Sequence, residues 1–212
     1  MKDFDRYDDP PSPSWDDGEG RPPAWSDAGP ELVAENPWMT LTVHDAVAPT
    51  GTSARYMVLH PANLAVGVLP IHEDGTVVLV GQQRFALKNY SWEMPEGGAP
   101  FDEAPLEGVK RELAEEAGLV AAHWEPALKL ELSNSITDER AMTWIAWDLS
   151  ATETAPDETE VIAVRRVPFR DLLAEIERGA VRDVMTVATA YKAYHMAREG
   201  ELPAALARAM LG

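Results

Sequence analysis

The sequence contains no cysteine, which excludes disulfide bonds and any chemistry that depends on a thiolate. Basic residues are scarce, because 18 lysines and arginines stand against 36 aspartates and glutamates, for a formal charge of −18. A protein that binds long nucleic acids presents a basic face, so this balance argues against nucleic-acid binding. A small phosphorylated substrate remains compatible with it, since bound cations can reverse the charge around a site.

Long apolar segments are also missing. No run approaches the roughly 20 apolar residues that a membrane-spanning helix needs. The N-terminal segment MKDFDRYDDPPSPSWDD lacks the apolar core of a signal peptide. We therefore predict no membrane association and a cytoplasmic location. The 212 residues suffice for one domain of ordinary size with a full hydrophobic core.

Composition and periodicity divide the chain into three parts. Residues 1–36 are rich in Pro, Asp, Gly and Ser, and we expect an acidic, mostly irregular tail there. Residues 37–200 are expected to form the main domain, with a strand hairpin at 37–60, and residues 201–212 a helical tail. The remaining strand signals precede and follow a central helix, and further helices come after them. This order predicts an α/β fold with a mixed sheet packed between helices.

The most informative stretch covers residues 97–119 and reads GGAPFDEAPLEGVKRELAEEAGL. Its second half carries apolar residues at three- and four-residue steps, which predicts a helix with one apolar face. Glu112, Glu115 and Glu116 stand at i, i+3 and i+4, so their carboxylates share another face. Gly118 suits the left-handed residue just past a helix end. The sequence therefore predicts three carboxylates gathered on one helical turn.

A solvated acidic face is the ordinary interpretation of such a turn, but two features favour a cation site. Arg111 is the positive group beside the cluster, and it cannot neutralise three carboxylates. A glycine-rich turn at 95–98 precedes the helix and can bring backbone carbonyls close to it. Carboxylate oxygens, a backbone carbonyl and water are the ligands that hard divalent cations prefer. Magnesium typically adds the phosphates of a substrate to a few protein carboxylates.

The stretch resembles the Nudix box, the signature of the Nudix hydrolases. The box reads Gly, five residues, Glu, seven residues, Arg-Glu-aliphatic, one residue, Glu-Glu, one residue, Gly-aliphatic, and every specified position is met here. The resemblance implies an α/β/α sandwich with a mixed central sheet, and Mg²⁺ as the cofactor with Mn²⁺ as the alternative. It implies metal ligation by Glu112, Glu115, Glu116 and the backbone carbonyl of Glu96. It assigns Arg111 to orienting these carboxylates through hydrogen bonds.

The flanking segments VGVLPIHEDGTVVLVGQQRF, YSWEMPEGG and LSNSITDE resemble one branch of the family, the ADP-ribose pyrophosphatases and nucleoside-diphosphate-sugar hydrolases. The resemblance implies a homodimer whose N-terminal strands cross to the partner, and cleavage of a nucleotide sugar into a nucleoside monophosphate and a sugar phosphate. ADP-ribose is the first candidate substrate. One segment departs from the branch, because a loop of the form SPGxSDE is SNSITDE at residues 133–139. GDP-mannose or a broader range of nucleotide sugars is therefore the alternative.

The same branch suggests further site residues. Glu139 matches the last acid of the SDE segment and is our candidate general base, with Glu115 as the alternative base and an ordinary loop acid as the competing interpretation. Arg84 resembles the arginine of the family's QxRY segment and can bind the phosphate or sugar side in a bidentate manner. A surface ion pair is its competing interpretation. Arg55 can reach a phosphate from the partner chain. Trp38 can stack on a base at a dimer interface, or simply pack in the core.

A second class of function is a Nudix domain that senses an ADP-ribose-like ligand without cleaving it. Such domains usually lose a glutamate of the box, and this sequence keeps all of them, which favours the enzyme. The histidines show no metal-ligand spacing, so we expect structural roles for His44, His60, His72, His123 and His195.

Overall fold

Two apolar strands form the centre of the large sheet, β4 (Asn63–Ile71) and β5 (Thr76–Arg84). Most of their side chains are buried, as expected of strands covered on both faces. The structure is a computed structural model that describes residue 7, residues 10–154 and residues 161–212. The first residues of the expected tail, 1–6 and 8–9, lie outside the described residues.

The large sheet has seven strands, in the order β10-β5-β4-β9-β8, with β6 paired to β5 and β7 paired to β4. Strands β4 and β9 run parallel and the other pairs are antiparallel, so the sheet is mixed as predicted. The further strands are β6 (Asn89–Glu93), β7 (Glu96–Pro100), β8 (Leu119–Glu131), β9 (Arg140–Ala151) and β10 (Ala163–Pro168).

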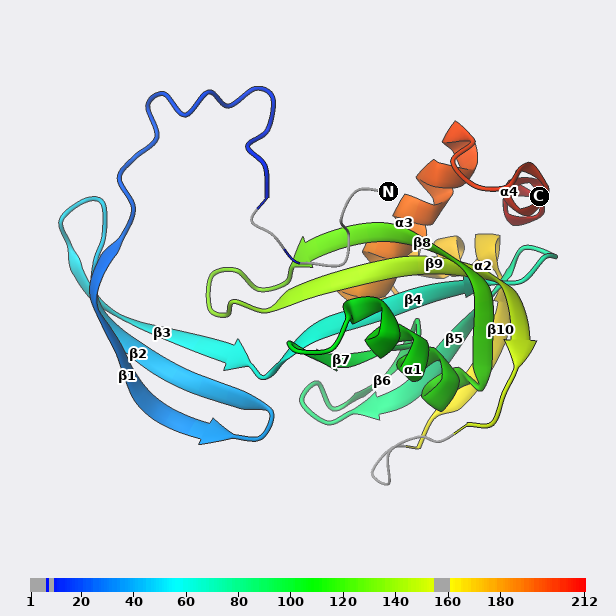
Figure 1. Cartoon of the computed structure of the whole chain (residues 1–212), viewed down its shortest axis with the longest axis horizontal. Helices are drawn as coiled ribbons and strands as arrows, with labels where there is room; N and C mark the ends of the chain where they lie inside the picture. The colour runs from blue at the N-terminus through cyan, green and yellow to red at the C-terminus, as the bar shows by residue number, and fades with distance from the viewer. Residues whose placement is uncertain (1–6, 8–9, 155–160) are drawn as a thin grey trace.

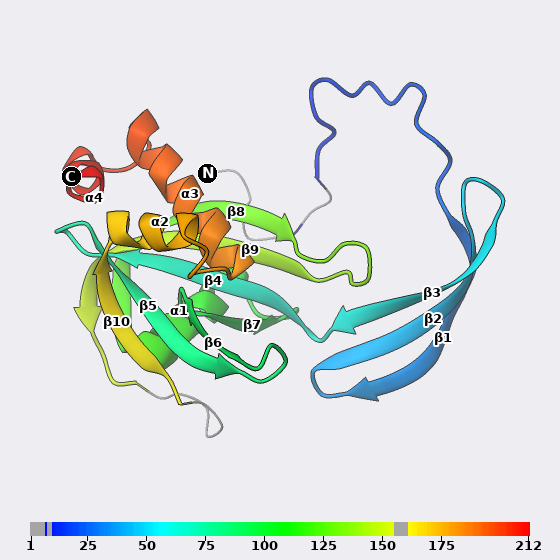
Figure 2. The same cartoon turned by 180° about the vertical axis from the view of Figure 1, so that it is seen from behind.

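Helices cover both faces of this sheet. Helix α1 (Pro105–Ala117) lies on one face, and α2 (Phe169–Glu177), α3 (Val184–Glu199) and α4 (Ala204–Leu211) lie on the other (Figures 1 and 2). Alternate residues of β4 feed two separate cores, because successive side chains of a strand point to opposite faces. Val66 and Val68 pack on the α1 side, whereas Leu69 and Ile71 pack on the side of α2, α3 and α4. The α/β/α sandwich is thereby confirmed.

Within the C-terminal residues 201–212, residues 204–211 form helix α4, which is part of the packed domain. Leu206 and Met210 of α4 are buried in the core that α2 and α3 share. Among the described residues, no helix has both the length and the apolar character needed to cross a membrane.

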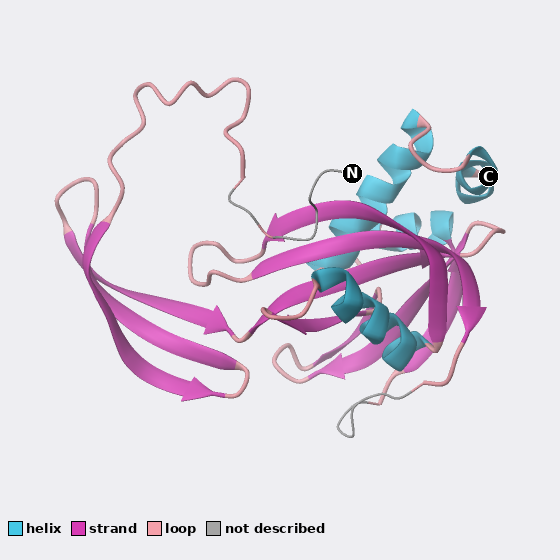
Figure 3. Cartoon of the chain, in the orientation of Figure 1, coloured by secondary structure: helices cyan, strands magenta, loops and turns pink. Residues whose placement is uncertain are grey.

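A separate sheet of three strands projects from the domain as an arm (Figure 3). It consists of β1 (Ser26–Asn36), β2 (Met39–Val47) and β3 (Ser53–Pro61), with β2 in the middle. The expected hairpin within residues 37–60 is therefore present, as the antiparallel pair of β2 and β3. We refer to the sheet of β1, β2 and β3 as the arm.

Two segments differ from the sequence-based expectation. Residues 26–36 form β1 although an irregular tail was expected up to residue 36. Gly29 and Pro30 disfavour a strand, every side chain of β1 is exposed, and two register shifts interrupt its pairing, so no alternating pattern marks it. Residues 96–98, expected to belong to a glycine-rich turn at 95–98, lie instead in the short strand β7, which pairs with β4.

Candidate active site

Helix α1 carries the acidic turn that the sequence predicts. Val109 and Leu113 are fully buried and fix the helix on the sheet. The helix ends at Gly118, which has a φ of 63° and donates its N–H to the carbonyl of Ala114. Leu119 directly after it begins β8, so the helix and the next strand are joined by this one left-handed residue.

Strand β7 runs against the glutamates of α1 at very short range. The carboxylate of Glu116, itself 4% exposed, accepts a hydrogen bond of 2.9 Å from the backbone N–H of Glu96. A Cβ atom at Gly97 would stand 2.3 Å from Cδ of Glu112, so only glycine leaves room for that carboxylate. The first glycine of the box therefore has a steric function, which is to let a carboxylate lie against the backbone of β7.

Arg111 holds the same carboxylates from the other side. One terminal nitrogen donates to Glu112 at 2.8 Å and to Glu115 at 3.0 Å, and the other donates to the carbonyl of Gly98 at 2.9 Å. Burial acts against the charged guanidinium, but the charges and hydrogen bonds of Glu112 and Glu115 outweigh it and raise the pKa of Arg111. These are the contacts of a residue that orients carboxylates.

The space between β7 and α1 suits a hard divalent cation. A cavity of about 220 Å³ is lined by residues 96–98, by Arg111 and by the three box glutamates Glu112, Glu115 and Glu116. Carboxylate and backbone oxygens are the ligands that Mg²⁺ and Ca²⁺ prefer, and these residues can offer both. The predicted metal ligands are therefore brought together around one cavity.

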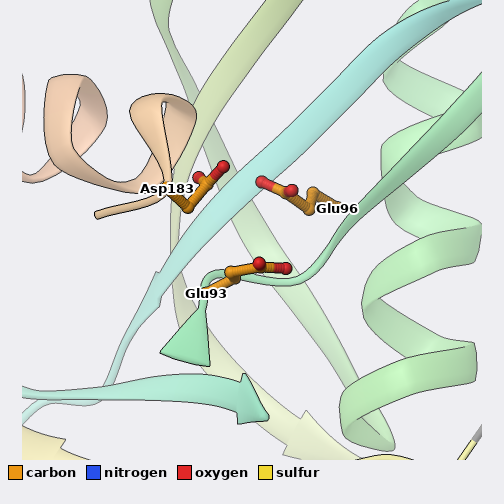
Figure 4. Close-up of side chains that lie close together, drawn as sticks. All are labelled: Glu93, Glu96 and Asp183. Carbon is orange, nitrogen blue, oxygen red and sulfur yellow. The ribbon is translucent and has the colours of Figure 1, made fainter. Parts of the chain in front are cut away.

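A second group of carboxylates adjoins this cavity and was not anticipated from the sequence. Glu93, Glu96 and Asp183 each offer a carboxylate oxygen within 4.8 Å of those of the other two (Figure 4). The sequence analysis assigned only the backbone carbonyl of Glu96, whereas the structure turns its side chain toward Glu93 and Asp183. Asp183 caps α3 by accepting a hydrogen bond from the N–H of Thr186 at 2.7 Å.

The electrostatics of this second group indicate a place for positive charge. Burial, followed by the charges of Asp183 and Glu93, raises the pKa of Glu96 well above the ordinary value for a glutamate. One oxygen of Glu96, Oε2, is buried and has no hydrogen-bond partner among the described residues. A cation bound beside it would supply the missing partner, so the site fits the divalent metal that the box implies.

Arg84 supplies positive charge that offsets part of the negative charge of Glu93 and Glu96. Its Nε lies 3.0 and 3.1 Å from the two carboxylate oxygens of Glu93, and one terminal nitrogen contacts both Glu93 and, at 3.3 Å, Glu96. Burial lowers the pKa of Arg84, but the hydrogen bonds and charge of Glu93 outweigh that effect and raise it. Arg84 lines the main cleft and its side chain is 36% exposed, so it is fixed by Glu93 and remains accessible from the cleft.

The main cleft has a volume of about 900 Å³, which is at the upper end of ordinary ligand sites. Glu96 and Gly97 line both this cleft and the smaller cavity at the box, so the two are neighbours. Exposed apolar side chains stand at its rim, where Phe85 is 84% and Leu87 71% exposed. With a divalent cation at its acidic end to offset the carboxylates, and apolar side chains at its rim, the cleft suits a ligand with phosphate at one end and an aromatic base at the other.

Glu139 also lines the main cleft. Partial burial raises the pKa of this carboxyl above the ordinary value for a glutamate. It lies at the end of the loop between β8 and β9, where its N–H donates to the hydroxyl of Thr137 at 3.1 Å. The structure therefore places the candidate base in the same cleft as Glu96 and Arg84.

Arg55 and Trp38 lie on the arm and do not line the cleft within this chain. Arg55 has a side chain that is 67% exposed, with Glu31 and Asp45 each 3.7 Å away. Trp38 is 75% exposed in the turn between β1 and β2, so the interpretation that it packs in the core is wrong. Substrate contacts of these two residues remain a prediction that requires a partner chain.

Comparison with known proteins settles the family. The model of the family described as NUDIX domain matches residues 61–186, more than half of the chain. The chain belongs to the Nudix family. It is therefore a Nudix hydrolase.

Two curated relatives of this Nudix hydrolase cover most of its length. It is 32% identical over 159 residues to an ADP-ribose pyrophosphatase of Bacillus subtilis (strain 168), over 74% of this chain and 85% of that protein. It is 28% identical over 176 residues to a GDP-mannose pyrophosphatase of Yersinia enterocolitica, over 74% of this chain and 88% of that protein. A crystal structure of an ADP compounds hydrolase shares the fold, with a TM-score of 0.75, 21% identity, and coverage of 84% and 97% of the two chains.

Proposed function

We propose that this Nudix hydrolase cleaves the pyrophosphate bond of a nucleoside diphosphate sugar in an Mg²⁺-dependent reaction. ADP-ribose, split into AMP and ribose 5-phosphate, is the first candidate. The observation that carries the proposal is the shared wall of the two cavities, where Glu96 and Gly97 join the box glutamates to the cleft that holds Glu139. The similarity to an ADP-ribose pyrophosphatase supports this choice of substrate.

The residues of the chain divide the chemistry among them. Glu112 and Glu116, with Glu115, would hold the cation, and Arg111 keeps their carboxylates in place. Divalent cations at such a site neutralise the charge of a pyrophosphate and make water a stronger acid. Glu139 takes the proton of the attacking water as that oxygen bonds to one phosphorus and the bridging P–O bond breaks. Because burial raises its pKa, Glu139 is a stronger base than a solvated glutamate.

The identity of the nucleotide sugar is the finer part of the proposal. GDP-mannose, or a broad range of nucleotide sugars, is the alternative, supported by the relative from Yersinia enterocolitica and by the loop SNSITDE. A domain that senses its ligand without cleaving it is the candidate from another class. Glu112, Glu115 and Glu116 all line one cavity, which leaves that candidate without support.

We also propose that the protein forms a homodimer through the arm. We propose a cytoplasmic location for it. The arm exposes large apolar side chains, which a partner chain would cover: Leu32, Val33, Trp38 and Met57. Sedimentation velocity of the whole chain tests this part, with a dimer as the expected species.

The proposal is tested by incubating the purified protein and Mg²⁺ with a substrate panel and identifying the products by mass. The panel contains ADP-ribose, GDP-mannose, UDP-glucose, diadenosine polyphosphates and 8-oxo-dGTP. Release of a nucleoside monophosphate from the nucleotide sugars is expected, whereas release of pyrophosphate from the triphosphate would contradict the proposal.

Two variants then test the assigned residues. Glu116→Gln and Glu139→Gln are each expected to lower kcat about a hundredfold or more, the upper part of the range for general acid–base catalysis. Glu199→Gln, an exposed glutamate at the end of α3, is the matched control and is expected to keep the wild-type kcat.

A further inference from the structure

The loop that carries Glu139 lies beside the arm (Figures 1 and 2). The N–H of Leu59 in β3 donates to the carbonyl of Ile136 at 3.0 Å. The hydroxyl of Tyr56, also in β3, donates to the carbonyl of Ser135. The order of the small sheet leaves β3 at its edge, so the loop occupies an edge that would otherwise be unpaired.

A histidine of the arm contacts the residue directly before the candidate base Glu139. Nδ1 of His60 in β3 lies 2.7 Å from a carboxylate oxygen of Asp138. Asp138 and Glu139 are the two residues directly before β9. The side chain of Asp138 contacts the arm, whereas Glu139 lines the cleft. Because the two residues are consecutive, a shift of Asp138 also moves Glu139, the candidate base.

The contact continues across all three strands of the arm. Nε2 of His60 lies 2.9 Å from the hydroxyl of Thr42 in β2, and the same hydroxyl lies 3.1 Å from Nε2 of His44. Nδ1 of His44 lies 2.6 Å from a carboxylate oxygen of Asp27 in β1. Thr42, in the middle of this series, is 8% exposed. We call the series Asp27–His44–Thr42–His60–Asp138 the histidine relay.

Each histidine of the relay faces a carboxylate through Nδ1 and the hydroxyl of Thr42 through Nε2. The hydroxyl of Thr42 therefore joins the two histidines, and Asp27 and Asp138 are the outer partners of the relay.

The loop's own hydrogen bonds do not replace this support. The N–H groups of Ile136 and Thr137 donate to the carbonyl of Ser133 at 2.9 and 3.1 Å. Such bonds fix the shape of the loop but not its position relative to the arm. The position is set by the contacts of Tyr56, Leu59 and His60 in β3.

We propose that His60 is a positioning residue for Glu139, acting through Asp138, and that Thr42 and His44 extend this support across the arm. The inference rests on the proposed function, in which Glu139 is the general base. It assigns a role in turnover to side chains of the arm that do not line the cleft. It also revises the structural role expected for His44 and His60 from the sequence alone.

The first test breaks the contact from either side. His60→Leu and Asp138→Ala are each expected to lower kcat about tenfold with KM little changed, a smaller loss than the roughly hundredfold effect of a 1 Å misplacement. His60→Asn, whose amide nitrogen stands where Nδ1 does, keeps a donor for Asp138 and is expected to restore most of the kcat. Thr42→Val, a near-isosteric change that cuts the relay in the middle, is expected to lower kcat by less than His60→Leu does.

His123→Ala is the matched control. His123 also faces an aspartate, Asp148 at 3.9 Å, but it lies in β8 near the opposite end of the β8–β9 hairpin. We expect wild-type kcat for this variant. Equal kcat values for His60→Leu, Asp138→Ala and His123→Ala would overturn the inference.

The second test asks whether His60 acts through Glu139. In a Glu139→Gln background, His60→Leu is expected to have no further effect on kcat, because the group that it positions is gone. A full additional tenfold loss would overturn the inference. Wild-type turnover of Glu139→Gln would remove Glu139 from the mechanism and, with it, the inference. A Glu139→Gln variant that is inactive, beside a His60→Leu variant that is fully active, would leave the proposed function standing and overturn the inference alone.

A third measurement does not depend on activity. The amide of Leu59, bonded to the carbonyl of Ile136, is expected to exchange its hydrogen faster in His60→Leu than in the wild type and in His123→Ala. Unchanged protection of this amide would contradict the claim that His60 holds the loop on the arm.

Discussion

Replacing Gly97 by alanine tests the close approach of β7 and α1. The added Cβ would stand 2.3 Å from Cδ of Glu112 and 2.4 and 2.5 Å from its two oxygens, whereas ordinary contacts of a Cβ begin at 3.4 Å. The carboxylate must therefore retreat by about 1 Å, and a misplacement of that size can lower a rate about a hundredfold. The retreat would also strain its 2.8 Å hydrogen bond to Arg111. We expect Gly97→Ala to lower kcat about a hundredfold and to raise the Mg²⁺ concentration needed for half-maximal activity.

The assay is the initial rate of ADP-ribose hydrolysis across a titration of Mg²⁺, with thermal unfolding as the check on folding. Gly179→Ala is the control, because a Cβ there meets nothing within 4 Å while φ is +75°. Its left-handed backbone should reduce stability by about 1–2 kcal/mol and leave kcat unchanged. Wild-type kcat and Mg²⁺ requirement in Gly97→Ala would refute the reasoning, since Glu112 would then need no contact with β7.

Further predictions follow from the other groups of the site. Since burial raises the pKa of Glu139, kcat should fall on acidification at a higher pH than a solvated glutamate would give, and Glu139→Gln should lose this limb of the pH–rate profile. The raised pKa of Glu96 means that the folded chain holds this proton more tightly than the unfolded chain, so the resulting stability is present below about pH 4.3 and is lost as pH rises through the raised value. Without divalent cations, the Tm of Glu96→Gln should therefore be higher than that of the wild type at pH 8 and equal to it at pH 4. Arg84→Lys cannot reproduce the paired contact with Glu93 and should lower kcat/KM about tenfold, since hydrogen bonds to charged groups contribute about 1.5–3 kcal/mol. Leu113→Ala removes a fully buried side chain and should reduce the free energy of unfolding in urea by about 2–5 kcal/mol.

The acidic turn and the sandwich could be predicted because their signals are local or periodic. Glu112, Glu115 and Glu116 owe their common face to helical spacing alone, and Gly118 ends the helix as its residue type suggests. The buried strands β4 and β5 follow from apolar runs that a covered sheet requires. The order of strands and helices then leaves few ways to bury both faces of the sheet.

The parts that could not be predicted depend on contacts between distant segments. From the sequence, Asp183 can be recognised only as the cap of a helix. The packing of α3 against the sheet is what brings it to Glu93 and Glu96. The relay through Thr42 and His60 depends on the register between β2 and β3 and on the loop before β9, which no local pattern fixes. The strand β1 was missed because an exposed, twice-interrupted edge strand lacks the alternation that burial imposes.

The central claim is that the carboxylates between β7 and α1 act with a divalent cation on the pyrophosphate of a nucleotide sugar. The most direct measurement follows ADP-ribose by mass spectrometry in the presence of Mg²⁺, after addition of excess EDTA, and after Mg²⁺ is restored. We predict AMP and ribose 5-phosphate in the first sample, no products in the second and recovery in the third. The same rate of product formation in EDTA would contradict the claim.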